Sequence, residues 1–209
     1  MEKDRRIKVL SIIALLIAVV GLTVAFSEMS KTLTINCSAK MDTAKWDIRF
    51  ENLTTEIEGT GKVITAPTLK ENDTYIGDFE VTLSKPGDSV TFNFEIVNKG
   101  DIASKFSDYL INGYNLYNQD GSDEYTLKLY DTIFEEADWN GDGITTQEEV
   151  IETIEKGIFI EFFLDEEKTL NNNETDNARL KIYFDSEATE VPKGKIKLKA
   201  NVQYLYDQA

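Results

Sequence analysis

Hydrophobic and polar residues alternate along much of the chain, and this alternation predicts β-strands. Between residues 46 and 50, Trp46, Ile48 and Phe50 alternate with charged residues. A period of two places every second side chain on one face of a sheet. The same pattern recurs over 32–41, 76–83, 89–98, 178–185 and 194–206. The run IFIEFFL at 158–164 is apolar almost throughout, which is typical of a strand buried on both faces.

The number and spacing of these segments predict the fold class. Seven or eight short strands separated by turn signals, such as KPGDS at 85–89, favour an antiparallel β-sandwich. The polar segments 51–74 and 165–178 predict loops. Apolar residues make up 41% of the 209-residue chain, enough for one domain with a full hydrophobic core. The chain has no internal repeat, so we expect a single β-sandwich domain over 28–209.

The block from about 101 to 156 breaks the alternation and predicts helices. Its first half contains SDEYTLKLYDTIFEEA, whose apolar residues follow one another at three- and four-residue spacing: Tyr125, Leu129, Tyr130, Ile133, Phe134 and Ala137. A second helix, QEEVIETIEK, is expected to begin after Thr146 and to end at Gly157. The sequence therefore predicts a helix–loop–helix insertion over 113–157.

The loop between these predicted helices, residues 138–149, has the spacing of a calcium site. A twelve-residue EF-hand loop needs oxygen ligands at positions 1, 3 and 5, glycine at 6, a carbonyl at 7, an oxygen or water at 9, and glutamate at 12. DWNGDGITTQEE resembles the EF-hand family over this whole length, with Gly143 at position 6. The predicted Ca²⁺ ligands are Asp138, Asn140, Asp142, Ile144 through its carbonyl, Thr146 and Glu149.

The loop departs from the EF-hand pattern at position 8, where the family carries a branched apolar residue. Here Thr145 stands at that position and the isoleucine is one place early, at Ile144. No second calcium loop accompanies the first. An unpaired loop with three carboxylates predicts a Kd of roughly 10⁻⁵ to 10⁻³ M. The alternative interpretation is a solvated acidic loop in which Thr146 and Glu149 form a T-x-x-E capping box.

The first 27 residues have the pattern of an export signal. Lysines and arginines at 3–8 precede an apolar run from Val9 to Phe26, and Ala25 and Ser27 place small residues before a cleavage point after Ser27. The alternative is an uncleaved anchor in which residues 9–26 cross the membrane. In both cases the positive residues stay inside and residues 28–209 are exported.

Charge and residue usage exclude several functional classes. The formal net charge of −16 disfavours binding to nucleic acid. The chain contains no histidine, which excludes Ser-His-Asp and Cys-His catalysis and the two-histidine zinc-protease helix. The single Cys37 cannot form an internal disulfide, and we interpret it as a small residue on a strand.

Several segments resemble the TasA and camelysin family of exported bacterial proteins. They are RRIKVLSIIALLIAVVGLTVAFS, WDIRFENL, SKPGDSVTFNFEIVNKGDIASKF and FDSEATEVPKGKIKLKANVQYLYDQA, which cover roughly 1–106 and 158–209 in pieces. The resemblance implies a jelly-roll-like sandwich, export through a dedicated signal peptidase, and assembly into extracellular matrix fibres. In such fibres an extended N-terminal segment of one subunit completes the sheet of the next. The calcium loop is not a general feature of that family.

Together these patterns predict an exported, calcium-binding structural protein of the cell surface or extracellular biofilm matrix, and not an enzyme. Its expected partners are calcium, copies of itself or other matrix proteins, and signal peptidase during export, with membrane contact only through 9–26 if that segment is uncleaved. Residues 28–41 would donate a strand to a neighbour or form the first strand of their own domain. A membrane-anchored monomeric calcium-dependent binding module is the alternative function, and a secreted hydrolase is a remote one.

Overall fold

The computed structural model describes residues 44–69, 74–115 and 129–209, all of which belong to one compact unit spanning 43–209. The chain is mainly β, and its strands form two antiparallel sheets, as the alternating pattern predicted. The expected export segment 1–27, the expected strand 32–41 and Cys37 lie outside the described residues.

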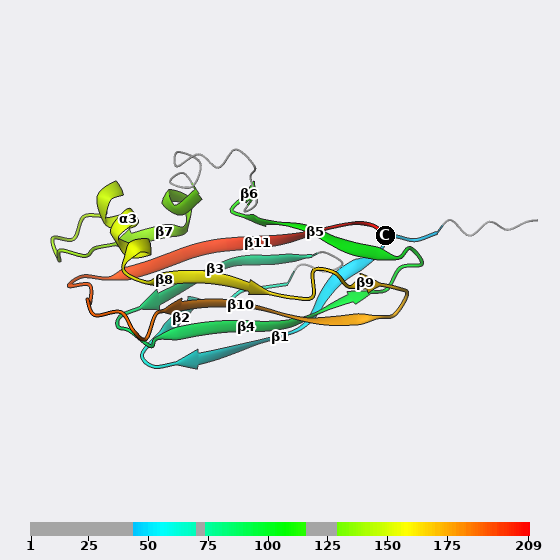
Figure 1. Cartoon of the computed structure of the whole chain (residues 1–209), viewed down its shortest axis with the longest axis horizontal. Coiled ribbons are helices and arrows are strands. Elements are labelled where there is room, and N and C mark those ends of the chain that lie inside the picture. Colours follow the sequence, from blue (N-terminus) through cyan, green and yellow to red (C-terminus); the bar gives the residue numbers. More distant parts are fainter. Residues whose placement is uncertain (1–43, 70–73, 116–128) are drawn as a thin grey trace, which may run out of the picture. The chain divides into compact units, whose positions relative to one another are not determined.

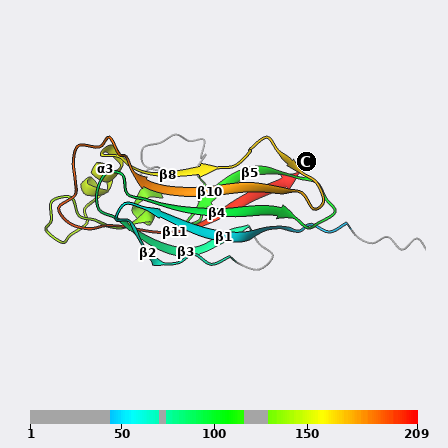
Figure 2. The ribbon, with the colours of Figure 1, turned by 90° about the horizontal axis from the view of Figure 1, so that it is seen from below.

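The first sheet, which we call sheet A, contains four strands in the order β1-β4-β10-β8. Seen in Figure 2, they lie side by side. All three pairings are antiparallel, so each strand of the sheet runs opposite to its neighbours. The bounds are β1 Ile48–Glu58, β4 Ser89–Asn98, β10 Thr175–Phe184 and β8 Ile158–Phe163.

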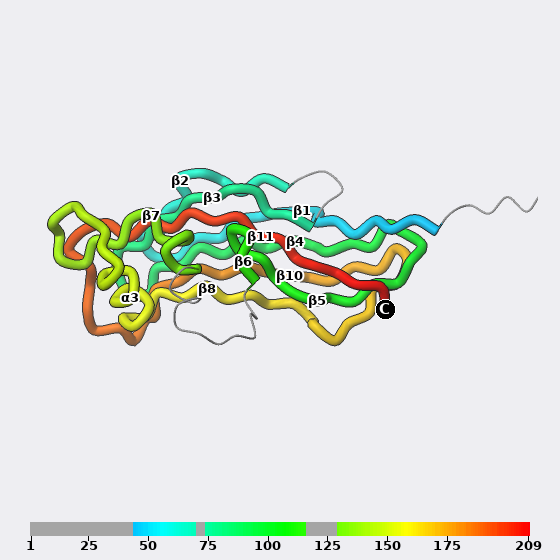
Figure 3. The backbone as a smooth tube through the Cα atoms, turned by 90° about the horizontal axis from the view of Figure 1, so that it is seen from above, coloured from blue at the N-terminus to red at the C-terminus, as the bar shows by residue number. Residues whose placement is uncertain are grey.

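The second sheet, sheet B, is ordered β2-β3-β11-β5-β6, with β7 pairing β11 and β9 pairing β5 (Figure 3). Its long central strand, β11, extends over Ile196–Gln208 and pairs β3 along one edge. The other edge pairs β7 and then β5 in succession. The remaining bounds are β2 Lys62–Thr65, β3 Tyr75–Leu83, β5 Ser104–Ile111, β6 Tyr114–Asn115, β7 Phe134–Ala137 and β9 Thr169–Leu170.

The two sheets pack face to face around one hydrophobic core (Figure 1). Aromatic rings meet across the interface: the centroids of Phe50 and Tyr204 are 5.1 Å apart, edge to face, and those of Phe79 and Phe92 are 5.0 Å apart. Edge-to-face and tilted aromatic pairs add to the free energy gained by burying their surface. The inward residues are the apolar half of each alternating pattern, so the period of two is the cause of the two-layer arrangement.

Both polar segments that predicted loops contain strands. Strand β1 continues to Glu58, and β2 follows within the segment 51–74; strand β9 lies within 165–178, and β10 begins at Thr175. Strand β5 likewise lies in the block where the alternation was expected to stop. Much of β1, β2 and the start of β10 is exposed and polar, so these segments lack the apolar half of the pattern and composition does not reveal them.

Strand β8 was expected to be buried on both faces, and this prediction is wrong. It is an edge strand that pairs only β10 among the described strands, and most of its residues are half-buried. Its outward aromatic residues instead contact side chains from β10, although Phe159 is still 38% exposed. The guanidinium of Arg179 lies 3.9 Å from the ring centroid of Phe163, and the Phe159 and Tyr183 rings are 5.6 Å apart.

Asn112 fills the gap between β5 and β7 along β11. Its backbone has a φ of 49°, a left-handed conformation that asparagine tolerates better than most residues. Its amide Nδ2 donates to the carbonyl oxygen of Thr132 at 2.7 Å and to that of Lys199 at 3.3 Å, and its Oδ1 accepts from the backbone N–H of Asn201 at 2.8 Å. The Asn112 side chain therefore supplies hydrogen bonds to β11 in the interval where neither β5 nor β7 pairs it.

The turn between β3 and β4 is organised around Asp88, which is fully buried. Its carboxylate accepts hydrogen bonds from the backbone N–H groups of Thr60 at 2.6 Å, Ser84 at 2.8 Å and Lys85 at 3.1 Å. The predicted KPGDS turn is thus joined through Asp88 to the β1–β2 connection.

The two ends of the described chain are fastened close together. The carbonyl of Lys45 accepts from the N–H of Asp101 at 2.7 Å, and the N–H of Ala209 donates to the carbonyl of Ala103 at 3.0 Å. Strand β7 and helix α3, Gln147–Glu155, lie at the opposite end of the sheets (Figure 1). The candidate loop therefore lies at the opposite pole from Lys45 and Ala209 (Figure 1).

Candidate metal centre

The chain enters the 138–149 loop from a strand and leaves it through a helix. Residues 129–133 are helical, but Phe134 and Ala137, expected on the same helix, lie on β7. In a regular strand, residues three apart point to opposite faces. Here β7 pairs β11 with a register shift, so Phe134 and Ala137 both face the core. The predicted helix leading into the loop is therefore wrong over its last turn, and pairing with β11 has overridden the helical spacing.

The outgoing helix is confirmed. Helix α3 begins after Thr146, whose hydroxyl accepts from the N–H of Glu149 at 3.3 Å, while the carboxylate of Glu149 accepts from the N–H of Thr146 at 3.1 Å. This reciprocal pair is a capping box. The helix ends at Glu155 with Lys156 as its C-cap, and Gly157 follows with a φ of 103°, the conformation expected of a glycine that stops a helix.

The carboxylate of Asp138 organises the first half of the loop. Its Oδ1 accepts from the N–H groups of Gly141 at 2.7 Å and Asp142 at 3.1 Å, and its Oδ2 accepts from Gly143 at 3.0 Å. Gly141 and Gly143 have φ values of 84° and 80°, so the chain can turn tightly enough to wrap around this carboxylate. The loop thus forms the turn at Gly143 that the spacing predicted.

Asn140 and Asp142 project from the exposed tip of the loop. The Oδ1 of Asn140 accepts from the N–H of Asp142 at 2.7 Å, and the Oδ1 of Asp142 accepts from the N–H of Ile144 at 2.8 Å. The amide of Asn140 also donates to Oδ2 of Asp142 at 3.2 Å. Positions 3 and 5 therefore place adjacent oxygens at the solvent-facing side of the loop.

Glu149 brings the end of the loop back to its beginning. The residue is 5% exposed, and its Oε1 accepts from the N–H groups of Trp139 at 3.1 Å and Asn140 at 3.2 Å. Its Oε2 accepts from both the N–H and the hydroxyl of Thr146 at 3.1 Å. Among the described residues Glu149 forms no ion pair, so its charge is held by N–H and O–H dipoles alone.

The residues at positions 7 and 8 of the loop differ in exposure and contacts. Ile144, expected to contribute its carbonyl, has a side chain that is 61% exposed. Thr145, at the position where an EF-hand has a branched apolar residue, accepts from the N–H of Ala137 at 3.0 Å through its hydroxyl. The contact that closes the loop is consequently a hydrogen bond to β7.

Three residues that support the loop were not identified from the sequence. The indole N–H of buried Trp139 donates to Oγ1 of Thr153 at 2.6 Å, and that hydroxyl donates to the carbonyl of Glu149 at 2.7 Å. Gly194 donates its N–H to the carbonyl of Asp138 at 2.9 Å and leaves room for the Asp138 side chain. Nothing in the local sequence marks Gly194, because its partner is 56 residues away.

The arrangement can be tested against the requirements of a calcium ion. Within the described ranges, no group of three or more histidine, cysteine, aspartate or glutamate side chains is arranged to hold a metal ion. The carboxylates of Asp138, Asp142 and Glu149 face backbone N–H groups instead. The donors nevertheless fit in kind, because all are oxygens, and a carboxylate oxygen that accepts one N–H keeps a further lone pair.

Comparison with protein-family models, with curated proteins and with solved structures finds no match for this chain. In the part of the chain that the structure describes, no helix has both the length and the apolar character needed to span a membrane. The possible anchor at 9–26 lies outside that part.

Proposed function

We propose that the chain is an exported structural protein of the cell surface or extracellular matrix that binds Ca²⁺ through the 138–149 loop. The ligands would be Asp138, Asn140, Asp142, the carbonyl of Ile144, Thr146 and Glu149. The observation that carries the proposal is the return of the Glu149 carboxylate to the N–H groups of Trp139 and Asn140. That contact joins the two ends of a twelve-residue loop whose oxygens have calcium-site spacing.

A bound divalent cation would neutralise the carboxylates of Asp138 and Glu149, whose negative charges are otherwise stabilised by hydrogen bonds from backbone N–H groups. It would also connect β7 with α3, because the ligand at position 1 directly follows β7 and the ligand at position 12 lies in α3. The free energy of unfolding of this region would rise by RT ln(1 + [Ca²⁺]/Kd), about 1–3 kcal/mol at ten to a hundred times Kd. Such an ion would stiffen one pole of the molecule without entering its core.

A fluorescence titration tests the calcium site. The chain has two tryptophans, so Trp46→Phe leaves Trp139, which adjoins the loop, as the only reporter. In that background we expect a saturable change with Ca²⁺, and calorimetry on the unmodified chain should give one site. Asp142→Asn should abolish both signals, whereas Asp131→Asn, the same charge change on an exposed residue outside the loop, should preserve them. Absence of binding at millimolar Ca²⁺ would leave only a capped acidic turn.

We propose further that the protein assembles through its N-terminal segment, with residues 28–41 adding a strand to a neighbouring subunit. A free edge supports this: β8 pairs only β10 among the described strands, and its other edge offers unpaired backbone groups. Filament formation, measured by light scattering and electron microscopy, should be lost on deletion of 28–41. Unchanged filaments in the deletion variant would contradict strand donation. The jelly-roll-like topology implied by the family resemblance remains a prediction.

The alternative proposal is a monomeric, membrane-anchored calcium-dependent module that retains residues 9–26. The mass of the mature N-terminus separates the two, because cleavage after Ser27 releases the chain and an intact start anchors it. A secreted hydrolase is the remote alternative. It would be detected as release of reducing sugar from a polysaccharide incubated with the chain.

A further inference from the structure

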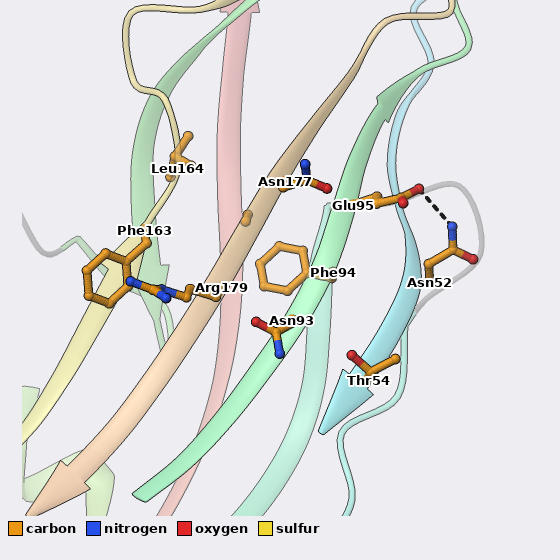
Figure 4. A pocket seen from close by; sticks show the side chains of 10 residues that line it. Asn52, Thr54, Asn93, Phe94, Glu95, Phe163, Leu164, Asn177 and Arg179 are labelled. Carbon is orange, nitrogen blue, oxygen red and sulfur yellow. Dashed lines mark hydrogen bonds between the residues drawn. The ribbon is translucent and has the colours of Figure 1, made fainter. Parts of the chain in front are cut away.

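We infer that the outward face of sheet A carries a binding groove for a neutral polysaccharide. The groove has a volume of about 790 Å³ and crosses all four strands of sheet A (Figure 4). Its lining, which defines the sheet groove below, consists of Asn52, Thr54, Asn93, Phe94, Glu95, Phe163, Leu164, Asn177, Ala178 and Arg179.

Strand register aligns four of these residues in one row. Thr54 of β1 pairs Asn93 of β4, Asn93 pairs Arg179 of β10, and Arg179 pairs Phe163 of β8. Adjacent strands are about 4.8 Å apart, so the row presents a new side chain at intervals comparable to a sugar ring. A linear ligand lying across the strands would therefore meet these four side chains in succession.

A β-bulge hollows the sheet beside this row. The pairing of β1 with β4 shifts register between Glu51 and Thr54, and Asn52 within the bulge has a φ of 56°. The bulge turns the Asn52 amide back over the sheet, where its Nδ2 donates to Oε2 of Glu95 at 2.7 Å (Figure 4). A bulge bends its strand and re-aims side chains, which explains the concavity of an otherwise open face.

Arg179 gives the groove a flat, polar platform. Its guanidinium lies 3.9 Å from the ring centroid of Phe163 and, among the described residues, forms no ion pair, although the chain carries a net charge of −16. Stacking on the ring holds the guanidinium flat and leaves its N–H groups available to a ligand. A stacked pair of this kind suits the face and the hydroxyls of a sugar ring together.

The other polar groups of the groove match hydroxyl groups. The side chains of Asn93 and Asn177 form no hydrogen bond within the described residues, and neither does the hydroxyl of Thr54. An amide both donates and accepts, as a sugar hydroxyl does, so each asparagine can bind adjacent hydroxyls in a complementary way. Several such groups beside an aromatic ring are the usual composition of a polar-ligand site.

Other classes of polymer fit the groove less well. A peptide strand cannot pair here, because β4 and β10 each have strands on both sides and their backbone groups are already bonded. Nucleic acid and acidic lipid are disfavoured by the overall charge of the chain. Among polymers, an uncharged polyhydroxylated chain fits best, because the amide and guanidinium groups of the lining match its hydroxyls.

Affinity electrophoresis tests the proposal on the full-length chain, solubilised in a detergent without a sugar headgroup. The probes are soluble starch, dextran, hydroxyethylcellulose and glycol chitin, with alginate as the acidic comparison. We expect at least one neutral polymer to retard the chain. Asn93→Ala and Arg179→Ala should each raise its dissociation constant about tenfold or more. Glu56→Ala is the matched control, because Glu56 is exposed on β1 but outside the groove, and it should leave retardation unchanged.

Three outcomes would overturn the inference. The first is failure of the unmodified chain to bind any neutral polymer of the panel. The second is equal binding by Asn93→Ala, Arg179→Ala and the unmodified chain, which would locate the contact elsewhere. The third is retardation mainly by alginate that weakens with salt and persists in Arg179→Lys. That result would show that Arg179 acts only through its positive charge, and not through its planar guanidinium. Both groove residues named for substitution are surface residues, so circular dichroism should confirm an unchanged fold.

Discussion

A β-carbon on Gly194 would lie 2.0 Å from Oδ2 of Asp138, so the first carboxylate of the loop occupies space that any other residue at 194 would need. The two residues are also joined by the hydrogen bond between the Gly194 N–H and the Asp138 carbonyl. The bend that precedes β11, and not only the loop itself, therefore fixes where Asp138 points.

Gly194→Ala should consequently disturb the loop. We expect a loss of about 1–3 kcal/mol in the free energy of unfolding, because the added methyl group must displace a hydrogen-bonded carboxylate. Hydrogen exchange of the 138–155 amides should accelerate. Lys195→Ala, a neighbouring surface change, should alter the free energy of unfolding by less than about 0.5 kcal/mol. Unchanged exchange in Gly194→Ala would show that Asp138 has another position available.

Glu149 and Asp142 should differ when calcium is chelated. Glu149→Gln removes an acceptor from a buried capping carboxylate, and we expect it to cost about 1–3 kcal/mol in the free energy of unfolding. Asp142→Asn at the exposed tip should change that free energy by less than about 0.5 kcal/mol. Chemical denaturation in a calcium chelator measures both. A similar cost for the two variants would show that the loop depends on its tip as much as on its cap.

The buried carboxylate of Asp88 predicts a loss of stability in acid. Burial acts to raise the pKa of Asp88, but hydrogen bonds from Thr60, Ser84 and Lys85 outweigh it and hold the pKa below the ordinary value of 3.8. Because the folded pKa is lower than the unfolded one, this stabilisation is present above 3.8 and disappears as the pH falls through the folded value.

Asp88→Asn should therefore cost about 1–3 kcal/mol at neutral pH, since the turn loses a charged acceptor for its N–H groups. Thermal unfolding followed from neutral pH to pH 3 should show a smaller decline for the variant than for the unmodified chain. Asp207→Asn, near the exposed C-terminus, serves as the control and should retain the full decline. Parallel curves for Asp88→Asn and the unmodified chain would assign the acid sensitivity to other carboxylates.

Asn112 predicts a stability effect without any ligand. Asn112→Ala would leave the N–H of Asn201 and the carbonyl of Thr132 without their side-chain partner, so we expect a cost of about 1–3 kcal/mol in urea denaturation. Asn177→Ala, which removes an exposed amide, should have an effect below about 0.5 kcal/mol. Equal effects would mean that water replaces Asn112 along β11.

The sequence predicted those elements in which one face of the pattern is buried. Strands β3, β4, β10 and β11 follow their apolar alternation, and α3 follows its cap and spacing, because local chemistry and tertiary burial agree there. Strand β7 was predicted as helix because Phe134 and Ala137 have helical spacing, and only pairing with β11 decides otherwise. Strand β8 looked like a central strand because the contacts of its outward aromatic residues come from Arg179 and Tyr183, 16 and 24 residues further along the chain.

The candidate loop was predictable to a similar degree. Its turn at Gly143 and the capping box of Thr146 and Glu149 are local in sequence, and both are present. The support from Gly194 and Thr153 was not predictable, because each acts through a contact that exists only in the folded chain. The groove was hidden for the same reason: Thr54, Asn93 and Arg179 are unremarkable separately and acquire a common role through strand register.

The fastening of Lys45 and Ala209 to residues 101 and 103 has a mechanical consequence. Tension applied between the two ends of the described chain enters and leaves the molecule at one pole, through the short segment after β4. The 138–149 loop and α3 at the other pole lie outside that load path (Figure 1). Force applied to the two ends would first strain the strands near Lys45 and Ala209. The conformational equilibrium of the 138–149 loop would not change.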